Sequence, residues 1–265
     1  MLEPNNILQG DSEEVLKTFP DECIDLVVTS PPYDNLRKYN GSGKGWSKEK
    51  FQTIADQLIR VLKPGGVIVW NVFDKVENGT RTGTSLEQCL YFKDKGLNIN
   101  DYMIWSKGNP MPVVRQPRYN PKFEFMFILS KGKPKTFNPL MRPCKSAGLH
   151  YTSTVKNIDG ESGRRQIDYH VNSEMVDYNI WEFAVAKNKT EYMVNGEKTK
   201  HPAVFPIELP LRHIKSWTNP GDIVLDPFAG SGTTLIAAKQ LNRSYIGIEL
   251  NNTYCEIIKQ RLKHG

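Results

Sequence analysis

The first residues whose types and spacing suggest chemistry are Ser30-Pro31-Pro32-Tyr33, which follow the apolar run 24–28. Proline fixes φ and donates no N–H, so two successive prolines hold this segment out of helix and sheet. A serine hydroxyl and main-chain carbonyls at such a turn can accept hydrogen bonds from an amino group while an aromatic ring stacks beside them. The pattern predicts a site for a flat, amino-bearing ring, although a plain proline turn at the end of a strand has the same sequence.

A second motif, Asp226-Pro227-Phe228-Ala229-Gly230-Ser231-Gly232-Thr233-Thr234, follows the apolar run 223–225 near the other end of the chain. Gly230 and Gly232 let the backbone approach a ligand closely, and the N–H groups at the start of the following helix face that ligand. The next predicted strand ends at Glu249, about twenty residues beyond the glycines. An acid at this position grips ribose hydroxyls in nucleotide-binding α/β folds. The order of strand, glycine turn, helix, strand and acid therefore predicts a nucleotide-type cofactor site.

Together, the two motifs resemble those of the amino-group DNA methyltransferases, which use S-adenosylmethionine. A catalytic motif that precedes the cofactor motif resembles the permuted β-class arrangement of that family. The resemblance covers nearly the whole chain and is weakest over about 135–199. It implies an α/β, Rossmann-like methyltransferase sheet with helices on both faces, circularly permuted, with a small target-recognition lobe. The implied division is 1–130 for the catalytic part, 131–199 for target recognition and 200–265 for the cofactor-binding part.

The resemblance also assigns roles to particular residues. The catalytic group is Ser30, Pro31, Pro32 and Tyr33. The cofactor-binding group is Asp11, Thr29, Pro202, Phe205, Asp226, Pro227, Phe228, Gly230, Ser231, Gly232, Thr233, Thr234 and Glu249. Asp11 is also a natural N-cap for the helix that follows it, and both interpretations stay open. In a permuted chain the first strand lies beside the last, so Asp11 and Glu249 are expected to line one pocket.

DNA contacts are expected from three polar segments. The glycine-rich segment 34–45 carries Arg37 and Lys38 and lacks the spacing of a phosphate-binding P-loop. It is interpreted as a loop that closes over DNA and the target base, and a plain solvated connection is the alternative. The long connection 107–121 carries Arg115 and Arg118, and Phe123 beyond it is either a base contact or an ordinary core residue. Basic residues alternate with aromatic ones in the region 131–200, which includes Arg164 and Arg165, as expected for a surface that reads DNA.

Composition sets broad limits. The 265 residues suffice for one substantial core, and the formal net charge of +6 favours a polyanionic partner. The four cysteines are far apart without a Cys-x-x-Cys pair, which indicates reduced thiols and neither a disulfide framework nor a metal site. The sequence shows neither a signal peptide nor an apolar run of about twenty residues, so we expect a cytoplasmic protein with no membrane partner.

Hydrophobic periodicity predicts the elements that position these motifs. The spacing of apolar residues predicts helices over 51–62, 85–95 and 253–262, and Pro64-Gly65-Gly66 ends the first of them. Short apolar runs predict strands over 7–9, 24–28, 67–70, 102–105, 122–129 and 222–226. Strands that alternate with helices favour a parallel sheet covered on both faces.

The expected reaction is transfer of a methyl group to the exocyclic amine of a base extruded from double-stranded DNA. In the resembled family a serine at position 30 goes more often with N4 of cytosine, while N6 of adenine remains the alternative. A catalytically silent DNA-binding subunit is less favoured, because both motifs are intact, and an RNA substrate is also open. A companion restriction endonuclease and a monomeric or homodimeric state are compatible with the sequence.

Overall fold

The structure is a computed structural model that describes residues 2–32, 46–110, 117–156, 164–185, 192–194, 197–199 and 205–264. For the residues of 155–156, 164–165, 192–194 and 197–199 and for residue 264, only the backbone is described. Clustering of the described chain gives two compact units, residues 1–138 with 179–265, and residues 139–178.

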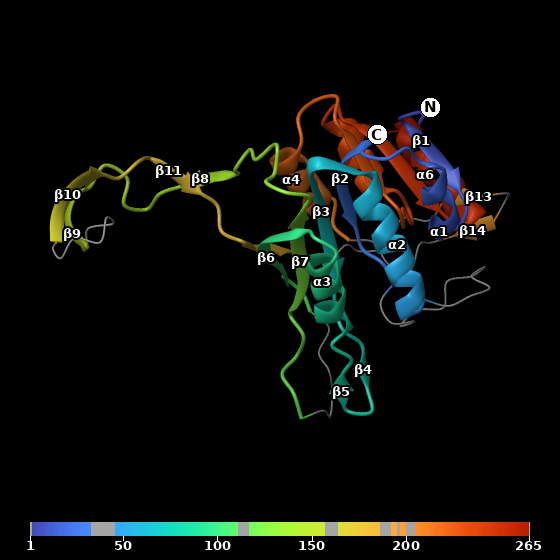
Figure 1. Cartoon of the computed structure of the whole chain (residues 1–265), viewed down its shortest axis with the longest axis horizontal. Coiled ribbons are helices and arrows are strands. Elements are labelled where there is room, and N and C mark those ends of the chain that lie inside the picture. Colours follow the sequence, from blue (N-terminus) through green and yellow to red (C-terminus); the bar gives the residue numbers. More distant parts are fainter. Residues whose placement is uncertain are drawn as a thin grey trace. The chain divides into compact units, whose positions relative to one another are not determined.

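An eight-stranded sheet in the order β1-β16-β15-β2-β3-β7-β6-β12 forms the centre of the first unit (Figure 1). Its strands are β1 (Asn6–Gln9), β2 (Ile24–Thr29), β3 (Leu62–Val72), β6 (Asn98–Lys107), β7 (Phe123–Ser130), β12 (Ile180–Phe183), β15 (Ile223–Asp226) and β16 (Ser244–Glu249). β2 is buried along its whole length, and apolar, β-branched residues make up most of it, as expected for a central strand covered on both faces.

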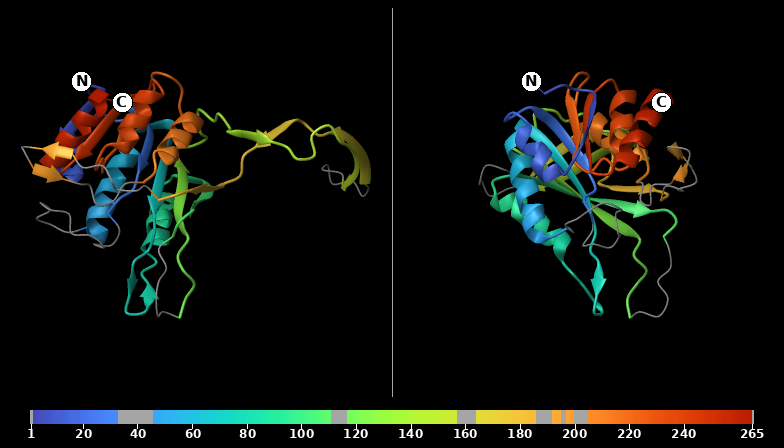
Figure 2. Two further views of the ribbon diagram at one scale, coloured as in Figure 1. Left: turned by 180° about the vertical axis from the view of Figure 1, so that it is seen from behind. Right: turned by 90° about the vertical axis from the view of Figure 1, so that its right-hand side faces the viewer.

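Helices cover both faces of this sheet (Figure 2). They are α1 (Ser12–Val15), the 3-10 helix η1 (Leu16–Thr18), α2 (Lys48–Val61), α3 (Thr84–Asp94), α4 (Glu208–Trp217), α5 (Thr233–Gln240) and α6 (Asn252–His264). The right-hand view separates α1, α2 and α3 on one face from α4, α5 and α6 on the other. This arrangement confirms the predicted α/β fold with helices on both faces of the sheet.

The strand order confirms the predicted permutation. β1 pairs in parallel with β16, and Gln9 is aligned with Glu249 in the register of this pair. The predicted positions of Asp11 and Glu249 at neighbouring strand ends follow from this pairing, because parallel strands end at the same edge of a sheet.

β7 differs from the expected parallel sheet, since it runs antiparallel to β3 and to β6. The physical reason lies in its connection to β6. Lys107 N donates to Lys122 O at 2.6 Å, so the connection returns to the edge at which β6 ends, and β7 runs back across the sheet beside it.

A large aromatic cluster fixes α2 and α3 on the sheet. The rings of Phe51 and Trp70 have centroids 5.9 Å apart, and those of Trp70 and Phe92 are 5.3 Å apart. Trp70 and Phe92 are fully buried, and the Trp70 indole N–H donates to Gln88 Oε1 at 2.8 Å, which satisfies its polar atom.

α2 begins at the N-cap Ser47, whose hydroxyl accepts from Lys50 N at 3.2 Å.

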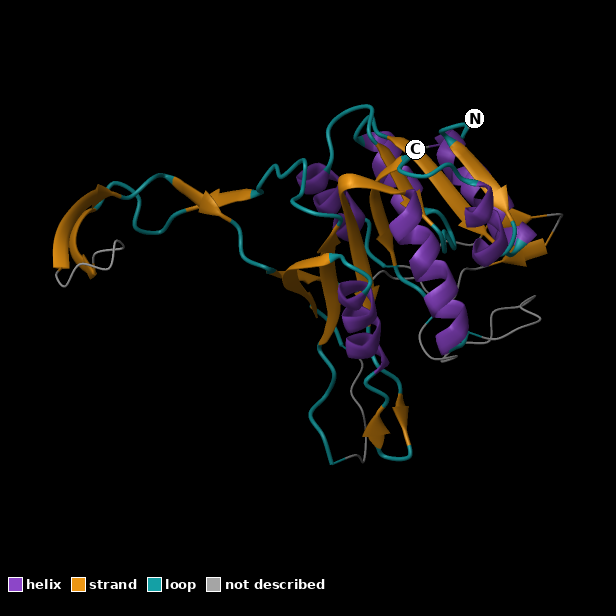
Figure 3. Ribbon diagram, in the orientation of Figure 1, coloured by secondary structure: helices purple, strands orange, loops and turns teal. Residues whose placement is uncertain are grey.

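Two short, two-stranded antiparallel sheets make up the second unit (Figure 3). β9 (His150–Lys156) pairs with β10 (Arg164–His170), and β8 (Met141–Pro143) pairs with β11 (Glu174–Val176). The Tyr151 and Tyr169 rings stack across the first pair with centroids 5.8 Å apart. This unit falls within the region 131–199 but is narrower, because β12 joins the main sheet beside β6. Two further hairpins belong to the first unit, β4 (Val76–Glu77) with β5 (Thr80–Arg81), and β13 (Tyr192–Val194) with β14 (Glu197–Thr199).

Within the described ranges, none of the helices combines the length and the apolar character that crossing a membrane requires.

Candidate active site at the carboxyl edge of the sheet

The two sequence motifs meet because their strands are neighbours. β2 and β15 pair in parallel, with Leu26 aligned with Val224, so both motifs leave the sheet at its carboxyl edge. A direct side-chain contact joins them: Thr29 Oγ1 donates to Asp226 Oδ1 at 2.7 Å. Motifs from opposite ends of the chain are therefore in direct contact at one edge of the sheet.

The Asp226 carboxylate shapes the turn at the end of β15. It is buried, and Phe228 N donates to the same Oδ1 at 3.0 Å. Burial raises the pKa of Asp226 to about 6, against the opposing effect of the hydrogen bonds from Thr29, Thr234 and Phe228. These hydrogen bonds indicate that Asp226 stabilises the conformation of the turn. Direct contact between Asp226 and a cofactor stays a prediction.

Contacts with α5 and α6 fix the conformation of the glycine turn. Gly232 is the N-cap of α5 with φ of 80°, and a Cβ there would lie 2.8 Å from the Ile258 side chain. Arg261 on α6 donates to Ser231 O at 2.6 Å and to Ser231 Oγ at 3.0 Å. Thr234 Oγ1 donates to Val28 O at 3.3 Å, which ties α5 to β2. The turn is therefore preorganised with the N-terminus of α5 at the carboxyl edge.

Glu249 lies at the end of β16 and faces the glycine turn. Gly230 N donates to Glu249 Oε2 and Asn251 N to Glu249 Oε1, each at 2.8 Å. Burial is the main cause that raises the pKa of Glu249 to about 7. A further main-chain hydrogen bond, from Leu250, also stabilises the ionised form, whose carboxylate has about four lone-pair sites. The remaining capacity suits the hydroxyls of a ribose.

Asp11 has the N-cap role that the sequence suggested, while its contact with a cofactor stays a prediction. It is the N-cap of α1, because its Oδ1 accepts from Glu13 N at 3.1 Å. It also lies beside the glutamate strand, since Gly10 N donates to Glu249 O at 3.0 Å. Its second oxygen forms an ion pair with Lys50 of α2, and the neighbouring Ser12 hydroxyl donates to Pro227 O. α1 is thereby linked to the cofactor motif.

Behind Ser30 lies a chain of polar side chains that the sequence analysis missed. Asn71 Nδ2 lies 3.5 Å from Ser30 Oγ and donates to Glu124 Oε2 at 2.9 Å. Glu124 Oε1 is 2.7 Å from Lys107 Nζ. Asn71 and Glu124 are buried. Ser30 directly follows β2, and the other three residues lie on β3, β7 and β6, so the chain of contacts follows the carboxyl edge across neighbouring strands. A polar residue near the end of the apolar run 67–72 was the signal that could have revealed Asn71.

Aromatic rings line the same edge on both sides of Ser30. On one side Phe228 packs against Trp46, with ring centroids 5.4 Å apart. On the other side Phe123 is 38% exposed, with its ring 5.3 Å from that of Phe73. Phe123 is therefore neither a fully buried core residue nor isolated on the surface, and its predicted contact with a base remains open.

Several predicted residues fall outside the described parts of the chain. They are Tyr33, Arg37, Lys38, Arg115 and Pro202. For Arg164 and Arg165 the structure gives the backbone of β10 and not the side chains. Pro31, Pro32 and Phe205 are described, and Arg118 donates to Gly79 O at 2.9 Å.

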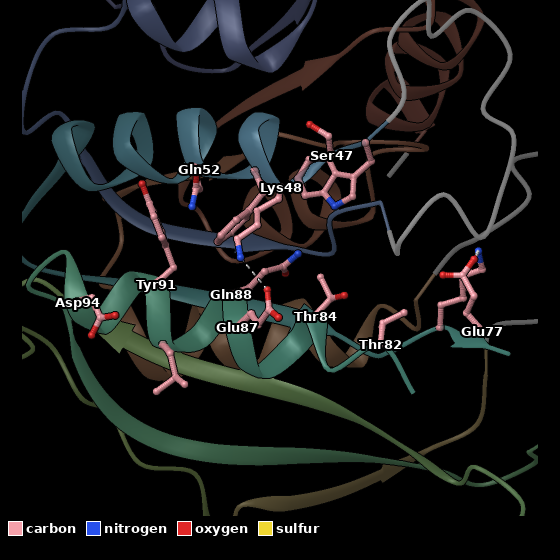
Figure 4. A pocket seen from close by; sticks show the side chains of 14 residues that line it. Ser47, Lys48, Gln52, Glu77, Thr82, Thr84, Glu87, Gln88, Tyr91 and Asp94 are labelled. Carbon is pink, nitrogen blue, oxygen red and sulfur yellow. Dashed lines mark hydrogen bonds and ion pairs between the residues drawn. The ribbon is translucent and has the colours of Figure 1, made fainter. Parts of the chain in front are cut away.

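A separate cavity of about 590 Å³ lies between the start of α2 and α3 (Figure 4). Lys48 and Glu87 reach toward each other across it and form an ion pair at 3.2 Å. Its lining contains Trp46, which packs on Phe228, and none of the residues predicted from the sequence motifs. Within the described ranges, no cluster of three or more His, Cys, Asp or Glu side chains is arranged to hold a metal ion.

Comparison with known proteins places this geometry in a family. The model of the N6_N4_Mtase family, described as DNA methylase, matches residues 24–260. The orphan methyltransferase M.BamHII of Bacillus amyloliquefaciens is 44% identical over 247 residues, which are 92% of this chain and 90% of that protein. The type II methyltransferase M.BglII of Bacillus subtilis is 32% identical over 97% of this chain and 69% of its own length.

Solved structures agree with the fold. The PvuII DNA methyltransferase, titled cytosine-N4-specific, superposes with a TM-score of 0.70 over 98% of this chain and 87% of that one, at 23% identity. The complex of M1.HpyAVI with SAM superposes with a TM-score of 0.61 over 97% of this chain and 98% of that one, at 24% identity. The family match, the relatives and the shared fold lead to one conclusion: the chain belongs to the amino-methyltransferase family of DNA methylases.

Proposed function

We propose that this protein is a site-specific DNA methyltransferase that transfers a methyl group from S-adenosylmethionine to N4 of a cytosine extruded from duplex DNA. The observation that carries the proposal is the Thr29–Asp226 hydrogen bond, which brings the serine motif and the glycine motif to one edge of the sheet. An acceptor for an amino group and a turn suited to a nucleotide-type cofactor therefore lie side by side.

The described residues fit such a cofactor. The turn at Gly230 and Gly232 presents backbone to a ligand without side chains, and the helix N-terminus of α5 follows it. Glu249 keeps acceptor capacity for a ribose hydroxyl after its main-chain hydrogen bonds from Gly230, Asn251 and Leu250. When bound, S-adenosylmethionine supplies a methyl group activated by a sulfonium centre.

Ser30 is placed to prepare the attacking amine. The lone pair of an exocyclic amine is conjugated with its ring, so the nitrogen is a poor nucleophile until its geometry is shifted toward tetrahedral. Acceptance of its two N–H bonds by the Ser30 hydroxyl and the Pro31 carbonyl promotes this shift, and Tyr33 is assigned to stack on the ring. As the new N–C bond forms the C–S bond breaks, and the amine proton leaves to solvent. Positioning and preorganised dipoles supply most of the rate, so no strong base is required.

The choice of cytosine rests on the serine at position 30, and N6 of adenine is the alternative product within the same family. The partner is duplex DNA, in keeping with the net charge of +6. We place the protein in the cytoplasm. A companion endonuclease is a further possibility that the type II name of M.BglII raises.

The test is incubation of the protein with S-adenosylmethionine and unmethylated DNA, followed by mass spectrometry of the digested nucleosides. N4-methylcytosine is the expected product. N6-methyladenine would retain the fold, cofactor and mechanism and overturn the base assignment. Absence of both products, with cofactor binding demonstrated by calorimetry, would overturn the proposed function.

Ser30→Ala tests the role of the hydroxyl. We expect kcat to fall about 100-fold or more, in the range for loss of one preorganised hydrogen-bonding group at the reacting atoms, with cofactor affinity unchanged. Full activity in this variant, with the cofactor bound, would remove Ser30 from the mechanism.

A further inference from the structure

Two projections leave the carboxyl edge beside the candidate active site. One is the β4–β5 hairpin, which follows β3, and the other is the segment 117–122, which leads into β7 (Figure 1). β3 and β7 are the first and second strands beyond β2 in the sheet. Because neighbouring strands are about 4.8 Å apart, both projections start roughly 5–10 Å from β2, the strand that Ser30 follows.

The hairpin is a short, well-defined support. Its turn has Asn78 and Gly79 in the left-handed region, with φ of 48° and 81°, which is the two-residue turn that suits the twist of a hairpin. Arg81 donates to Asp74 O at 3.1 Å, and its guanidinium lies 4.2 Å above the Phe73 ring. The hairpin is therefore anchored at its base by the aromatic group that also contains Phe123.

Arg118 connects the segment 117–122 to the β4–β5 hairpin by a hydrogen bond. Its Nη2 donates to Gly79 O at 2.9 Å, at the turn of the hairpin. The next residue, Tyr119, is 99% exposed, whereas the other exposed large hydrophobic residues described on this unit range from 38% to 59%. Because the Tyr119 side chain buries almost no surface, it contributes almost nothing to the stability of the fold.

Two arginines on the projections keep donors for a polyanion, and the one acid of the hairpin, Glu77, is paired with Lys75. Across the parts of the chain that the structure describes, neither Arg81 nor Arg118 forms an ion pair with a carboxylate; both donate to main-chain carbonyls. A guanidinium has five N–H donors, so each arginine retains donors for phosphate oxygens.

We propose that Tyr119 stacks on the DNA bases next to the extruded base, and that Arg118 and the β4–β5 hairpin hold it in position; this inference rests on the proposed function. Extrusion removes the stacking partner of the neighbouring base pair. An aromatic ring can replace that partner whatever the base, because every base has a π-face. Tyr119 then stabilises the open duplex, and Arg118 acts through its bond to Gly79 as a positioning residue.

The first experiment uses the DNA site identified by sequencing the methylated product. We expect Tyr119→Ala to lower kcat/KM on the matched duplex about tenfold or more, with unchanged affinity for S-adenosylmethionine. On a duplex with a mismatch opposite the target base, extrusion costs less, so the loss should shrink to about threefold or less. Tyr119→Phe retains the ring and should stay within about twofold of the parent.

Tyr102→Ala is the matched control, because Tyr102 is 55% exposed on β6 and belongs to neither projection. Arg118→Lys keeps the charge but not the forked geometry, and should reproduce part of the Tyr119→Ala loss. An equal loss on matched and mismatched duplexes, or no loss on either, would overturn the proposed role of Tyr119.

A second measurement does not depend on methyl transfer. In Tyr119→Trp, the fluorescence added by the new indole should be quenched when the protein binds duplex DNA, as measured against the parent under the same conditions. Quenching without methyl transfer would reject the proposed function and retain the stacking role. Binding without quenching, or no binding to DNA at all, would reject the stacking role.

Discussion

Thr29 Oγ1 and Asp226 Oδ1 are 2.7 Å apart although the two residues are separated by 197 positions in the chain. The bond connects a buried hydroxyl with a buried carboxylate, so its loss leaves Asp226 with one fewer donor. We expect Thr29→Val to lower the free energy of unfolding by about 1–3 kcal/mol, as for other buried acceptors that lose a partner. Thr29→Ser keeps the hydroxyl and should cost less. Urea denaturation of the three proteins measures the difference, and equal stability of Thr29→Val and the parent would contradict it.

The pH dependence of stability provides a test of the Asp226 environment. Burial raises its pKa from 3.8 to about 6, so between these values the folded chain binds a proton more tightly than the unfolded chain. The free energy of unfolding should therefore fall as pH rises from about 4 to about 6, by about 3 kcal/mol at most for this group. Asp226→Asn should remove this fall. Burial lowers the pKa of His213 to about 3, so this residue makes the free energy of unfolding rise with pH. Its contribution is the same in variant and parent and cancels when the two are compared.

Glu249 should make cofactor binding depend on pH. Its pKa is raised to about 7, chiefly by burial, and the ionised form is the better acceptor for hydroxyl groups. We expect affinity for S-adenosylmethionine to increase as pH rises from about 6 to 8. Glu249→Gln should bind more weakly and lose this dependence. Calorimetric titration across this range is the measurement, and a pH-independent affinity in the parent would remove Glu249 from the cofactor site.

Gly232 and Gly221 form a matched pair for the glycine turn. Both have positive φ, 80° and 91°, but a Cβ at Gly232 would lie 2.8 Å from Ile258, whereas a Cβ at Gly221 would meet nothing within 4 Å. Gly221→Ala should cost only the conformational strain, about 1 kcal/mol. Gly232→Ala should cost clearly more and also weaken cofactor binding, because α5 must shift. The measurements are thermal unfolding and cofactor titration of both variants. Equal effects would mean that the packing of Gly232 against Ile258 of α6 contributes neither to stability nor to cofactor binding.

The Lys107–Glu124 ion pair behind Ser30 should be tested with single and double substitutions. Both side chains are largely buried, with side-chain exposures of 20% and 11%. Lys107→Met removes the cation from a buried carboxylate and should cost about 3–5 kcal/mol, while the pair Lys107→Met with Glu124→Gln should recover part of that loss. If the chain of contacts through Asn71 positions Ser30, kcat should fall in the single variant with KM for DNA nearly unchanged. Additive effects in the double variant would show that the two residues act independently.

Much of the fold was accessible from the sequence because its strong signals are local. The apolar spacing over 51–62 predicted α2, and the serine and glycine motifs predicted which strand ends form the site. The pairing of β1 with β16 followed from the order of the motifs in the resembled family.

The missed features depend on contacts between distant residues. Asn71, Glu124 and Lys107 lie on three strands, and the sequence gives no sign that they touch until the antiparallel placement of β7 is known. Arg261 is similar, because a basic residue on a terminal helix is common and its bond to Ser231 depends on how α6 packs. β12 was missed because its short strand lies in a region without clear periodicity.

The position of β15 and β16 between β1 and β2 has a consequence for the order in which the protein can fold. The residues that separate these two early strands, 223–249, leave the ribosome long after both strands have been made. Until then β1 has no partner in the sheet and one edge of β2 is open. Pairings of such long sequence separation make folding slow, and exposed strand edges can recruit other chains. Expression at low temperature or with chaperones that shield strand edges should therefore increase the yield of folded protein.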